Sequence, residues 1–109
     1  MITLNQGINR MLIPKVDMPT PMPAVVMLQL VNTATNRQVW CELTDLLGLS
    51  DWFEYNIEVV GAAADPLQGQ IAMNAKDAGQ WNATIYGGAV YSEAPSTLTE
   101  LRKERVQYV

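Results

Sequence analysis

The sequence predicts an all-β fold, an antiparallel β-sandwich of about seven strands with an extended N-terminal arm. Three observations support this prediction. Short segments rich in β-branched and aromatic residues recur about every 10 to 15 residues, with turn-forming residues between them. The segment WFEYNIEVV, residues 52–60, alternates between hydrophobic and polar side chains. No long helical pattern precedes the C-terminal segment, so the strands have to pack against one another.

Length and composition predict one domain, residues 1–109, and exclude several kinds of partner. Hydrophobic residues make up 49% of the chain, enough for a core, yet no apolar run approaches the roughly 20 residues that cross a bilayer. The N-terminus lacks the basic and apolar blocks of a signal peptide. The net charge is −4, and acidic residues interrupt the cationic cluster Arg102, Lys103 and Arg105. We therefore expect neither a membrane nor a nucleic acid as a partner.

Residues 1–23 combine N-terminal strand segments with an arm rich in methionine and proline. The stretches ITL and RMLIP are short candidate strands. The stretch that follows, Lys15–Pro23, holds three prolines and two methionines. Proline cannot donate a hydrogen bond to a sheet, so this stretch predicts an extended arm or an edge segment.

The first half of the domain predicts two strands joined by a polar turn. Residues 24–32 are rich in β-branched and apolar side chains, and residues 33–37 form the turn. In residues 38–43 the side chains of Val39, Cys41 and Leu43 share one face, opposite Trp40. Residues 44–51 predict a single short helical turn, capped by Thr44 and ending near Gly48.

The second half predicts three or four further strands. In residues 52–60, the hydrophobic row faces the core and the acidic and amide side chains face water. Turn regions at residues 61–69 and 75–79 flank a strand at residues 70–74. A strand at residues 80–86 directs Trp81, Ala83 and Ile85 inward, and residues 87–97 form a loop. Residues 98–109 fit a closing strand or a helix, because Glu100 and Glu104 lie four residues apart.

The residue types argue against an enzyme. The chain contains no histidine, which removes Ser-His and Cys-His nucleophile pairs and most zinc sites. Asp45, Asp51 and Glu54 lie close in sequence, but their spacing does not match a calcium-binding loop. Cys41, the lone cysteine, shares a face with apolar residues and is expected to be a buried, inert thiol. We predict no catalytic, cofactor-binding or metal-binding residues.

Six residues are candidates for an interface with a partner. Trp40 and Trp52 lie on strand faces opposite the apolar rows, and exposed aromatic residues often mark contact surfaces. The alternative is that the N-terminal segment or the C-terminal strand covers them. An arm carrying Met11, Met18 and Met22 packs either on its own domain or on a neighbouring subunit, and we favour the neighbour because prolines keep the arm extended. Tyr91 completes the set, since with the two tryptophans it could stack on a sugar ring.

The stretch DAGQWNA, residues 77–83, resembles the strand of immunoglobulin domains that carries an Asp-x-Gly-x-Tyr-x-Cys pattern. Trp81 stands where the tyrosine would be, and Ala83 stands where the disulfide cysteine would be. Trp40 is a candidate counterpart of the core tryptophan of those domains. The resemblance implies that the sandwich is immunoglobulin-like.

A broader resemblance covers most of the chain. The segments MITLNQG, PMPAVVMLQLVNTATNRQVW, LTDLL, WFEYNIEV, ADPLQGQIAM, GQWNATIYGG and ERVQYV resemble a family of small proteins of tailed bacteriophages, especially those of Bacteroidetes hosts. This resemblance implies a non-enzymatic structural protein of the virion, assembled in the host cytoplasm.

The first expectation is an auxiliary protein that decorates or cements the capsid. Its partners would be the major capsid protein or other virion proteins, with self-association as a further possibility. One alternative is a tail, neck or fibre-attachment component of the same particle. Another alternative is a carbohydrate-binding or host-surface-binding module that uses Trp40, Trp52 and Tyr91.

Overall fold

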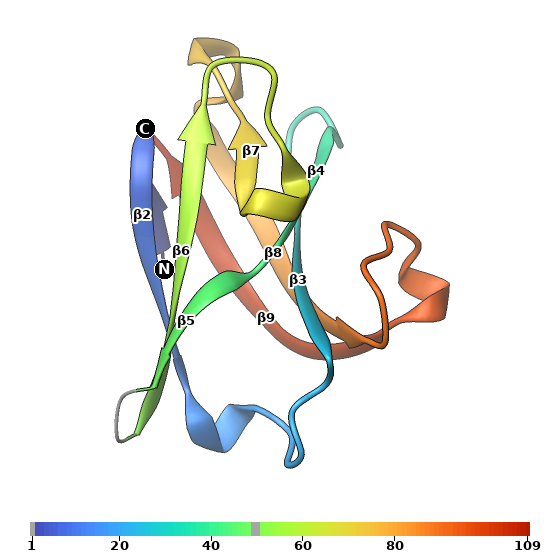
Figure 1. The fold of residues 1–109 in the computed structure, drawn as a ribbon. Coiled ribbons are helices and arrows are strands. Elements are labelled where there is room, and N and C mark those ends of the chain that lie inside the picture. Colours follow the sequence, from blue (N-terminus) through green and yellow to red (C-terminus); the bar gives the residue numbers. More distant parts are fainter. Residues whose placement is uncertain (1, 49–50) are drawn as a thin grey trace.

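The computed structural model describes residues 2–48 and 51–109, and this part of the chain is all-β (Figure 1). Two sheets face each other across a common core, and no element longer than a short 3-10 turn interrupts them. The all-β prediction is therefore confirmed. The structure has nine strands within the described residues, two of them only three residues long, where the sequence predicts about seven.

The first layer is a five-stranded sheet in the order β1-β9-β8-β3-β4. Its strands are β1 (Ile2–Leu4), β9 (Thr99–Tyr108), β8 (Gly79–Gly88), β3 (Val25–Asn32) and β4 (Gln38–Glu42). Neighbouring strands are antiparallel, except that β1 runs parallel to β9 and pairs with its last residues. A bulge between Ile85 and Tyr86 shifts the β8–β9 register. Strand β9 is strongly curved (Figure 1).

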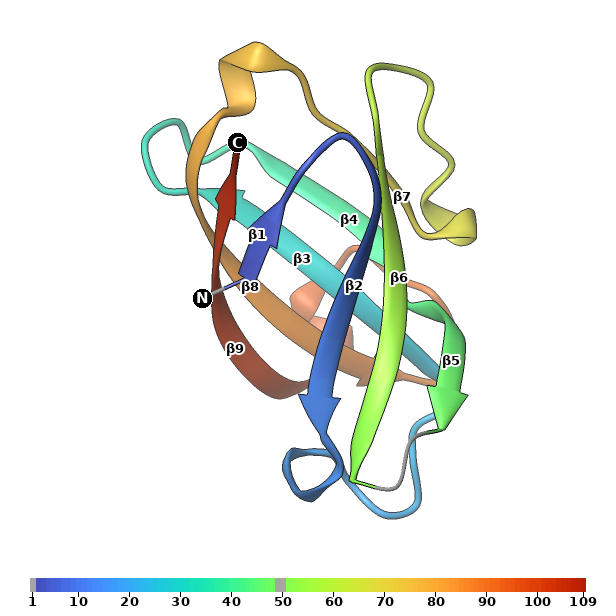
Figure 2. The same ribbon diagram turned by 90° about the vertical axis from the view of Figure 1, so that its left-hand side faces the viewer.

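The second layer is a four-stranded sheet built around β6 (Trp52–Val60). Along the whole of β6 lies β2 (Gly7–Pro14), which forms one edge of the sheet (Figure 2). The other side of β6 pairs with β5 (Thr44–Gly48) near its start and with β7 (Gln70–Ala72) near its end. Hydrophobic residues of β6 point inward, as the alternating pattern predicts, because Tyr55, Ile57 and Val59 are each 1% exposed.

In the part of the chain that the structure describes, four 3-10 turns connect the strands: η1 (Lys15–Asp17), η2 (Pro66–Gln68), η3 (Ala75–Asp77) and η4 (Pro95–Thr97). The side chain of Asp65 accepts a hydrogen bond from the Leu67 amide at 3.1 Å, which starts η2. Asn74 and Asp77 cap η3 reciprocally, in the manner of a capping box. No helix in the described part of the chain is long and apolar enough to cross a membrane.

The core lies between the two sheets and takes side chains from both. Its buried members include Leu4, Met11, Ile13, Leu28, Leu30, Cys41, Tyr55, Ile57, Val59, Ile71, Met73, Trp81, Ala83, Ile85, Val106 and Tyr108. The predicted inward row of β8 is among them, because Trp81, Ala83 and Ile85 are each 1% exposed. Burial of these apolar side chains is the main stabilising contribution to the fold.

Two expectations about local structure are settled by strand pairing. The prediction of a helical turn at residues 44–51 is wrong, because Thr44–Gly48 is strand β5 and pairs with β6 across a bulge. Pairing with a neighbouring strand thus overrides the capping signal of Thr44; residues 49–50 lie outside the described part. The C-terminal segment is the strand β9, not a helix, and it pairs with β8 along most of its length.

The N-terminal segment is integrated into both sheets through its two strands. Strands β1 and β2 contain the candidate segments ITL and RMLIP, and the chain crosses from one sheet to the other between Leu4 and Gly7. Only residues 15–24 remain as a connection without strands, and η1 lies at its start. Strand β2 ends at Pro14, and the prolines at 19, 21 and 23 keep this connection out of the sheets.

Removing the cations Arg102 and Arg105 together, as alanine, is expected to leave the protein folded. Arg102 pairs with Asp17 and Glu104 but is part exposed, and Arg105 is exposed. Ion pairs that remain accessible to solvent contribute little, so we expect a loss of at most about 1 kcal/mol in the free energy of unfolding. Urea denaturation followed by circular dichroism measures this change. Loss of a cooperative transition would contradict the assignment.

Candidate interaction surface

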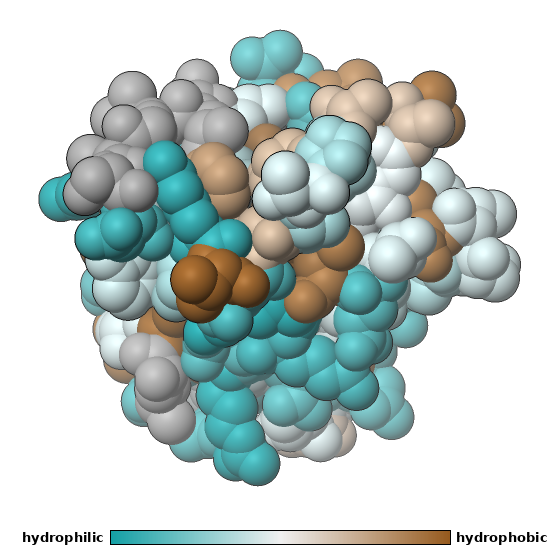
Figure 3. Space-filling model, turned by 90° about the horizontal axis from the view of Figure 1, so that it is seen from below, coloured by the Kyte–Doolittle hydropathy of each residue, from teal (hydrophilic) through white to brown (hydrophobic). Residues whose placement is uncertain are grey.

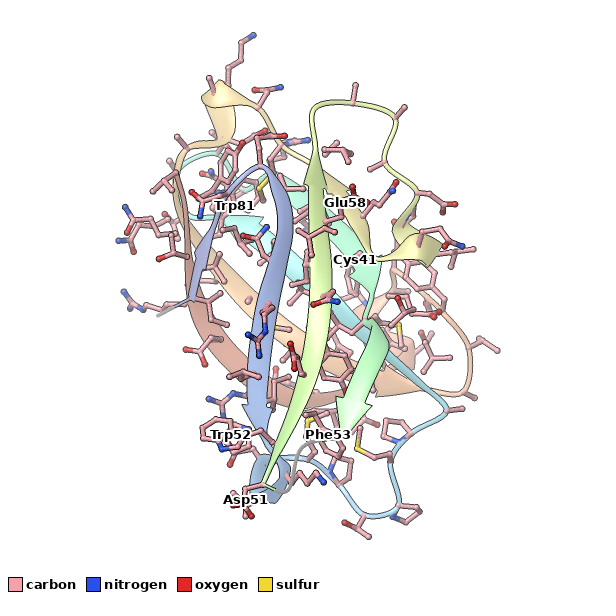
Figure 4. The ribbon with its side chains drawn as sticks, turned by 60° about the vertical axis from the view of Figure 1, so that its left-hand side comes forward. Cys41, Asp51, Trp52, Phe53, Glu58 and Trp81 are labelled. Carbon is pink, nitrogen blue, oxygen red and sulfur yellow. The ribbon has the colours of Figure 1, made fainter. Side chains whose placement is uncertain are left out.

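An apolar stripe crosses the outer face of the four-stranded sheet. It consists of Ile8, Leu12 and Trp52, whose exposed fractions are 72%, 44% and 43%. Ile8 and Leu12 alternate along β2 with the buried residues Met11 and Ile13 on the other face. Trp52 is opposite Pro14 in the β2–β6 register. Figure 4 shows Trp52 at the start of β6, close to the labelled residues Asp51 and Phe53.

Paired charged groups on the same face interrupt the apolar stripe. Arg10 forms an ion pair with Glu54, and Glu54 is only 7% exposed although it lies on the outer face. The arginine side chain itself is 64% exposed, so its stem and remaining donors are accessible. Glu58 accepts a hydrogen bond from Gln70 at 2.9 Å, which ties β6 to β7. The accessible charge at the centre of this face is therefore the guanidinium of Arg10.

The three methionines predicted as interface residues pack on their own domain. Met11 is 2% exposed and Met18 is 6% exposed, and both belong to the main core. Met22 is part buried and packs against the same core. Of the two alternatives for these side chains, packing on the chain's own domain is the one found. Met11 and Met18 are therefore not free to contact a neighbouring subunit, whereas Met22 remains part exposed.

Trp40 does lie on the face opposite Cys41 and Leu43, but this face is covered. Trp40 is 8% exposed and stacks on Tyr86, with ring centroids 5.6 Å apart and planes 23° apart. Together with Met27 they form a second, smaller core on the outer face of the five-stranded sheet. Tyr91 and Leu98, from the β8–β9 connection and its end, pack over this cluster. The cover comes from this connection and not from the N-terminal segment or the C-terminal strand.

Tyr91 belongs to the edge of that cover. Its hydroxyl donates a hydrogen bond to Glu93 at 2.6 Å. Partial burial, together with the hydrogen bond and charge of Glu93, raises the pKa of Tyr91 above its ordinary value. Tyr91 therefore stays neutral and serves the packing over Trp40. The three aromatic residues proposed for sugar stacking do not converge, because Trp52 lies on the other sheet.

The outer face of β8 and β9 carries a shallow polar depression of ≈ 440 Å³. Asn82, Thr84, Lys103 and Arg105 line it. The surface is open, Glu104 also lines it, and no aromatic residue does, so it offers hydrogen bonds and charges of both signs without a stacking platform. Within the described residues, no three His, Cys, Asp or Glu side chains are placed to hold a metal ion.

Cys41 is 0% exposed, and its burial raises the pKa of the thiol to about 12. An unfolded thiol ionises near pH 8.5, so only the unfolded state loses this proton between about pH 8.5 and 12. The contribution of Cys41 to stability is therefore full below about pH 8.5 and is lost as the pH rises towards 12. Between pH 7 and 10, we expect this group to account for a loss of about 2 kcal/mol.

Urea denaturation of the wild type and of Cys41→Ala at both pH values measures the effect. The alanine variant keeps the other titrating groups, including Tyr55, whose burial also raises its pKa. Its stability should therefore fall less between pH 7 and 10 than that of the wild type. Equal falls in the two proteins would contradict a buried, protonated thiol.

Sequence reasoning places Trp52 on the surface but misses Ile8 and Leu12. In the β2 stretch GINRMLIP, both alternating rows contain large apolar residues, so the pattern does not tell which row faces the core. The cation Arg10, between Ile8 and Leu12, is the one signal that marks the outer row.

Figure 3 shows the end of the molecule near the β2–β3 connection, where hydrophobic side chains form separate spots on a mainly hydrophilic surface.

Compared with protein-family models, curated proteins and solved structures, the chain gives no match.

Proposed function

We propose that this protein is a non-enzymatic structural protein of a bacteriophage particle, an auxiliary protein that decorates or cements the capsid. The resemblance of its motifs to small proteins of tailed phages supports the virion role. The observation that carries an assembly role is the apolar stripe Ile8, Leu12 and Trp52, exposed on a framework of two packed sheets. Exposed apolar residues grouped on one face favour a protein partner.

In this proposal the partner of the apolar stripe is the major capsid protein or a neighbouring virion protein. A rigid sheet presents the stripe without the entropy loss that ordering a flexible loop would bring. The single contact is small, but repetition over a symmetric shell makes weak contacts effective through avidity. A modest stripe is therefore sufficient for stable decoration of a particle.

We propose further that the two sheets are a variant of the immunoglobulin-like sandwich. The support is local: Asp77 precedes β8, and Trp81 of the same motif is buried between the sheets. The counterpart suggested for the core tryptophan does not support it, because Trp40 packs on the outer face of its sheet. A solved structure of the protein in its particle tests the strand order against this architecture.

The first experiment is to count copies per particle by quantitative mass spectrometry of purified virions. A ratio near parity with the major capsid protein, or one copy per few shell subunits, supports decoration. A much smaller ratio moves the protein to the tail, neck or fibre attachment. Absence from virions discards the virion role.

The second experiment tests the apolar stripe on particles that lack the protein. Purified Trp52→Ala and Leu12→Ser variants should each bind such particles more weakly than the wild type, by about tenfold. Val90→Ser is the matched control, because Val90 is also exposed, at 68%, but lies in the β8–β9 connection. Unchanged binding of both stripe variants would contradict a contact through this face.

A further inference from the structure

Strand β2 leaves one row of backbone groups without a strand neighbour. It forms an edge of the four-stranded sheet and pairs only with β6. The Lys15 amide continues this ladder by donating to the Asp51 carbonyl at 3.0 Å. Since backbone groups alternate in direction along a strand, the odd-numbered residues of β2 face β6. The N–H and C=O groups of Ile8, Arg10 and Leu12 therefore point away from it, to the open side.

The opposite side of β6 gives the same alternation. The Glu58 amide donates to the Gly69 carbonyl at 2.9 Å, on the side where β7 lies. Glu58 is opposite Ile8 in the β2–β6 register. In an antiparallel pair, opposite residues both face each other or both face away. Ile8 thus faces away from β6, in agreement with the ladder at Lys15.

The other sheet edges are protected in ways that β2 is not. Strands β1 and β7 have three residues each, and β5 is interrupted by a bulge. Strand β4 contacts β7 and η2, and the part of β9 beyond its pairing with β1 carries Glu100, Lys103, Glu104 and Arg105. Short, bulged, covered or charged edges resist pairing with other chains. Strand β2 has eight residues, is mostly apolar, and meets a proline only at its end.

The space beside this edge is closed on its inner side by the five-stranded sheet. The five-stranded sheet continues past β2, with β1 and β9 visible beyond it in Figure 2. On the inner face of β9 the register places Arg102 and Glu104 opposite the inward-facing Ile85 and Ala83. Their side chains remain 27% and 24% exposed, although they face the interior side. A strand added beside β2 would lie over these two residues.

The part of the five-stranded sheet that extends past β2 limits which occupant fits. If a second copy of the domain paired its own β2 here about a two-fold axis, its β1 and β9 would enter the layer that β1 and β9 of the first copy already occupy. A single extended segment has no such second layer and fills the space alone. Its outward side chains would lie next to Ile8, Arg10 and Leu12. Apolar residues suit the two ends, and an acidic residue suits the exposed guanidinium of Arg10.

We propose that the open edge of β2 receives an extended segment of a partner polypeptide as an added antiparallel strand. The segment carries apolar, acidic and apolar side chains at alternate positions. It extends the four-stranded sheet by main-chain hydrogen bonds to Ile8, Arg10 and Leu12, and the side-chain pattern selects it. This inference rests on the proposed assembly role, but the edge is a property of the isolated chain.

The test is amide hydrogen exchange of the isolated protein, followed by NMR. Without a partner, the amides of Ile8, Arg10 and Leu12 should exchange fast, while those of Asn9, Met11 and Ile13 should be protected. The probe is the synthetic peptide Thr-Val-Thr-Glu-Thr-Val-Thr. At saturation it should slow exchange of the three outward amides by at least about tenfold. A peptide with lysine in place of glutamate should bind several-fold more weakly.

Two variants separate the edge from the side-chain pattern. Leu12→Pro removes one outward N–H and should abolish the protection. Leu12→Thr keeps this N–H and loses only the apolar contact, so it should weaken peptide binding but still show the protection at saturation. Unchanged protection of Met11 and Ile13 shows that the variant is folded. The Arg10→Gln variant should bind the glutamate and lysine peptides with equal affinity. This comparison tests the contribution of the Arg10 charge and does not depend on whether the proline variant folds.

Three results would overturn the inference. The first is protection of the outward amides in the free protein. The second is unchanged exchange of these amides in the presence of the glutamate peptide. The third is protection that increases with protein concentration when no peptide is present. The last result would identify a second copy as the occupant. None of these results bears on whether the protein is present in virions, so the two proposals fail separately.

Discussion

Replacing Trp81 by alanine is expected to lower the free energy of unfolding by about 3–5 kcal/mol. Trp81 is 1% exposed and is the largest of the fully buried side chains described by the structure. Its indole N–H also donates to the Asp77 carbonyl at 2.8 Å, which fixes the entry of the chain into β8. Alanine would leave a cavity between the sheets and an acceptor without its donor.

A loss of this size is a large part of the 5–15 kcal/mol typical of a small domain. Urea denaturation followed by fluorescence and circular dichroism measures it. Trp81→Phe keeps most of the apolar volume but loses the hydrogen bond, so it should cost clearly less than alanine. Trp52→Ala, at a side chain 43% exposed, should change stability by no more than about 0.5 kcal/mol. Equal effects of Trp81→Ala and Trp52→Ala would contradict the buried position of Trp81.

The second large effect is expected at Asp77, which is only 7% exposed. One carboxylate oxygen accepts a hydrogen bond from the Asn74 amide at 3.0 Å, and the other pairs with Arg37. Arg37 also donates to the Ala72 carbonyl at 3.2 Å. Asp77 therefore links η3 to the arginine at the end of the β3–β4 connection. Asp77→Ala removes both contacts, and we expect a loss of about 2 kcal/mol.

Two controls define the origin of that loss. Lys76→Ala changes an exposed neighbour in the same turn and should stay within about 0.5 kcal/mol of the wild type. Asp77→Asn keeps an acceptor for the Asn74 amide and removes the charge next to Arg37. Its loss of stability should therefore lie between those of Lys76→Ala and Asp77→Ala. Thermal unfolding monitored by circular dichroism ranks the three variants. A loss at Lys76 as large as that at Asp77 would refute the role of the carboxylate.

Strands with one apolar row are predictable from the sequence, and strands without such a row are not. In β6 every second residue from Phe53 to Val59 is hydrophobic, and the strand bounds agree with the predicted segment. In β9 the inward row contains Arg102 and Glu104 before Val106, so no period of two is visible there. The choice between strand and helix for that segment depends on its pairing with β8. Such pairing is a tertiary contact that local sequence does not encode.

The candidate interaction surface is likewise predictable from the sequence only in part. Alternation assigns Trp40 and Trp52 to faces opposite the apolar rows, and this assignment agrees with the structure. It does not reveal that the β8–β9 connection covers one of these faces and leaves the other open. Which of two faces is covered depends on where a connection folds, and polar loop sequence carries little information about that. Ile8 and Leu12 were missed because Met11 and Ile13, equally apolar, occupy the inner row of the same strand.

The parallel pairing of β1 with β9 has a consequence for how the protein is made. Ile2 pairs with Val106, and Leu4 pairs with Tyr108, so residues near opposite ends of the chain complete the same sheet. Synthesis proceeds from the N-terminus, and β1 leaves the ribosome long before its partner exists. The five-stranded sheet cannot close until residue 108 has emerged. Such distant pairings also slow folding, because a long loop must close before the contact stabilises anything. During translation, the apolar residues of β1 and β2 would therefore be exposed to chaperones and to other nascent chains.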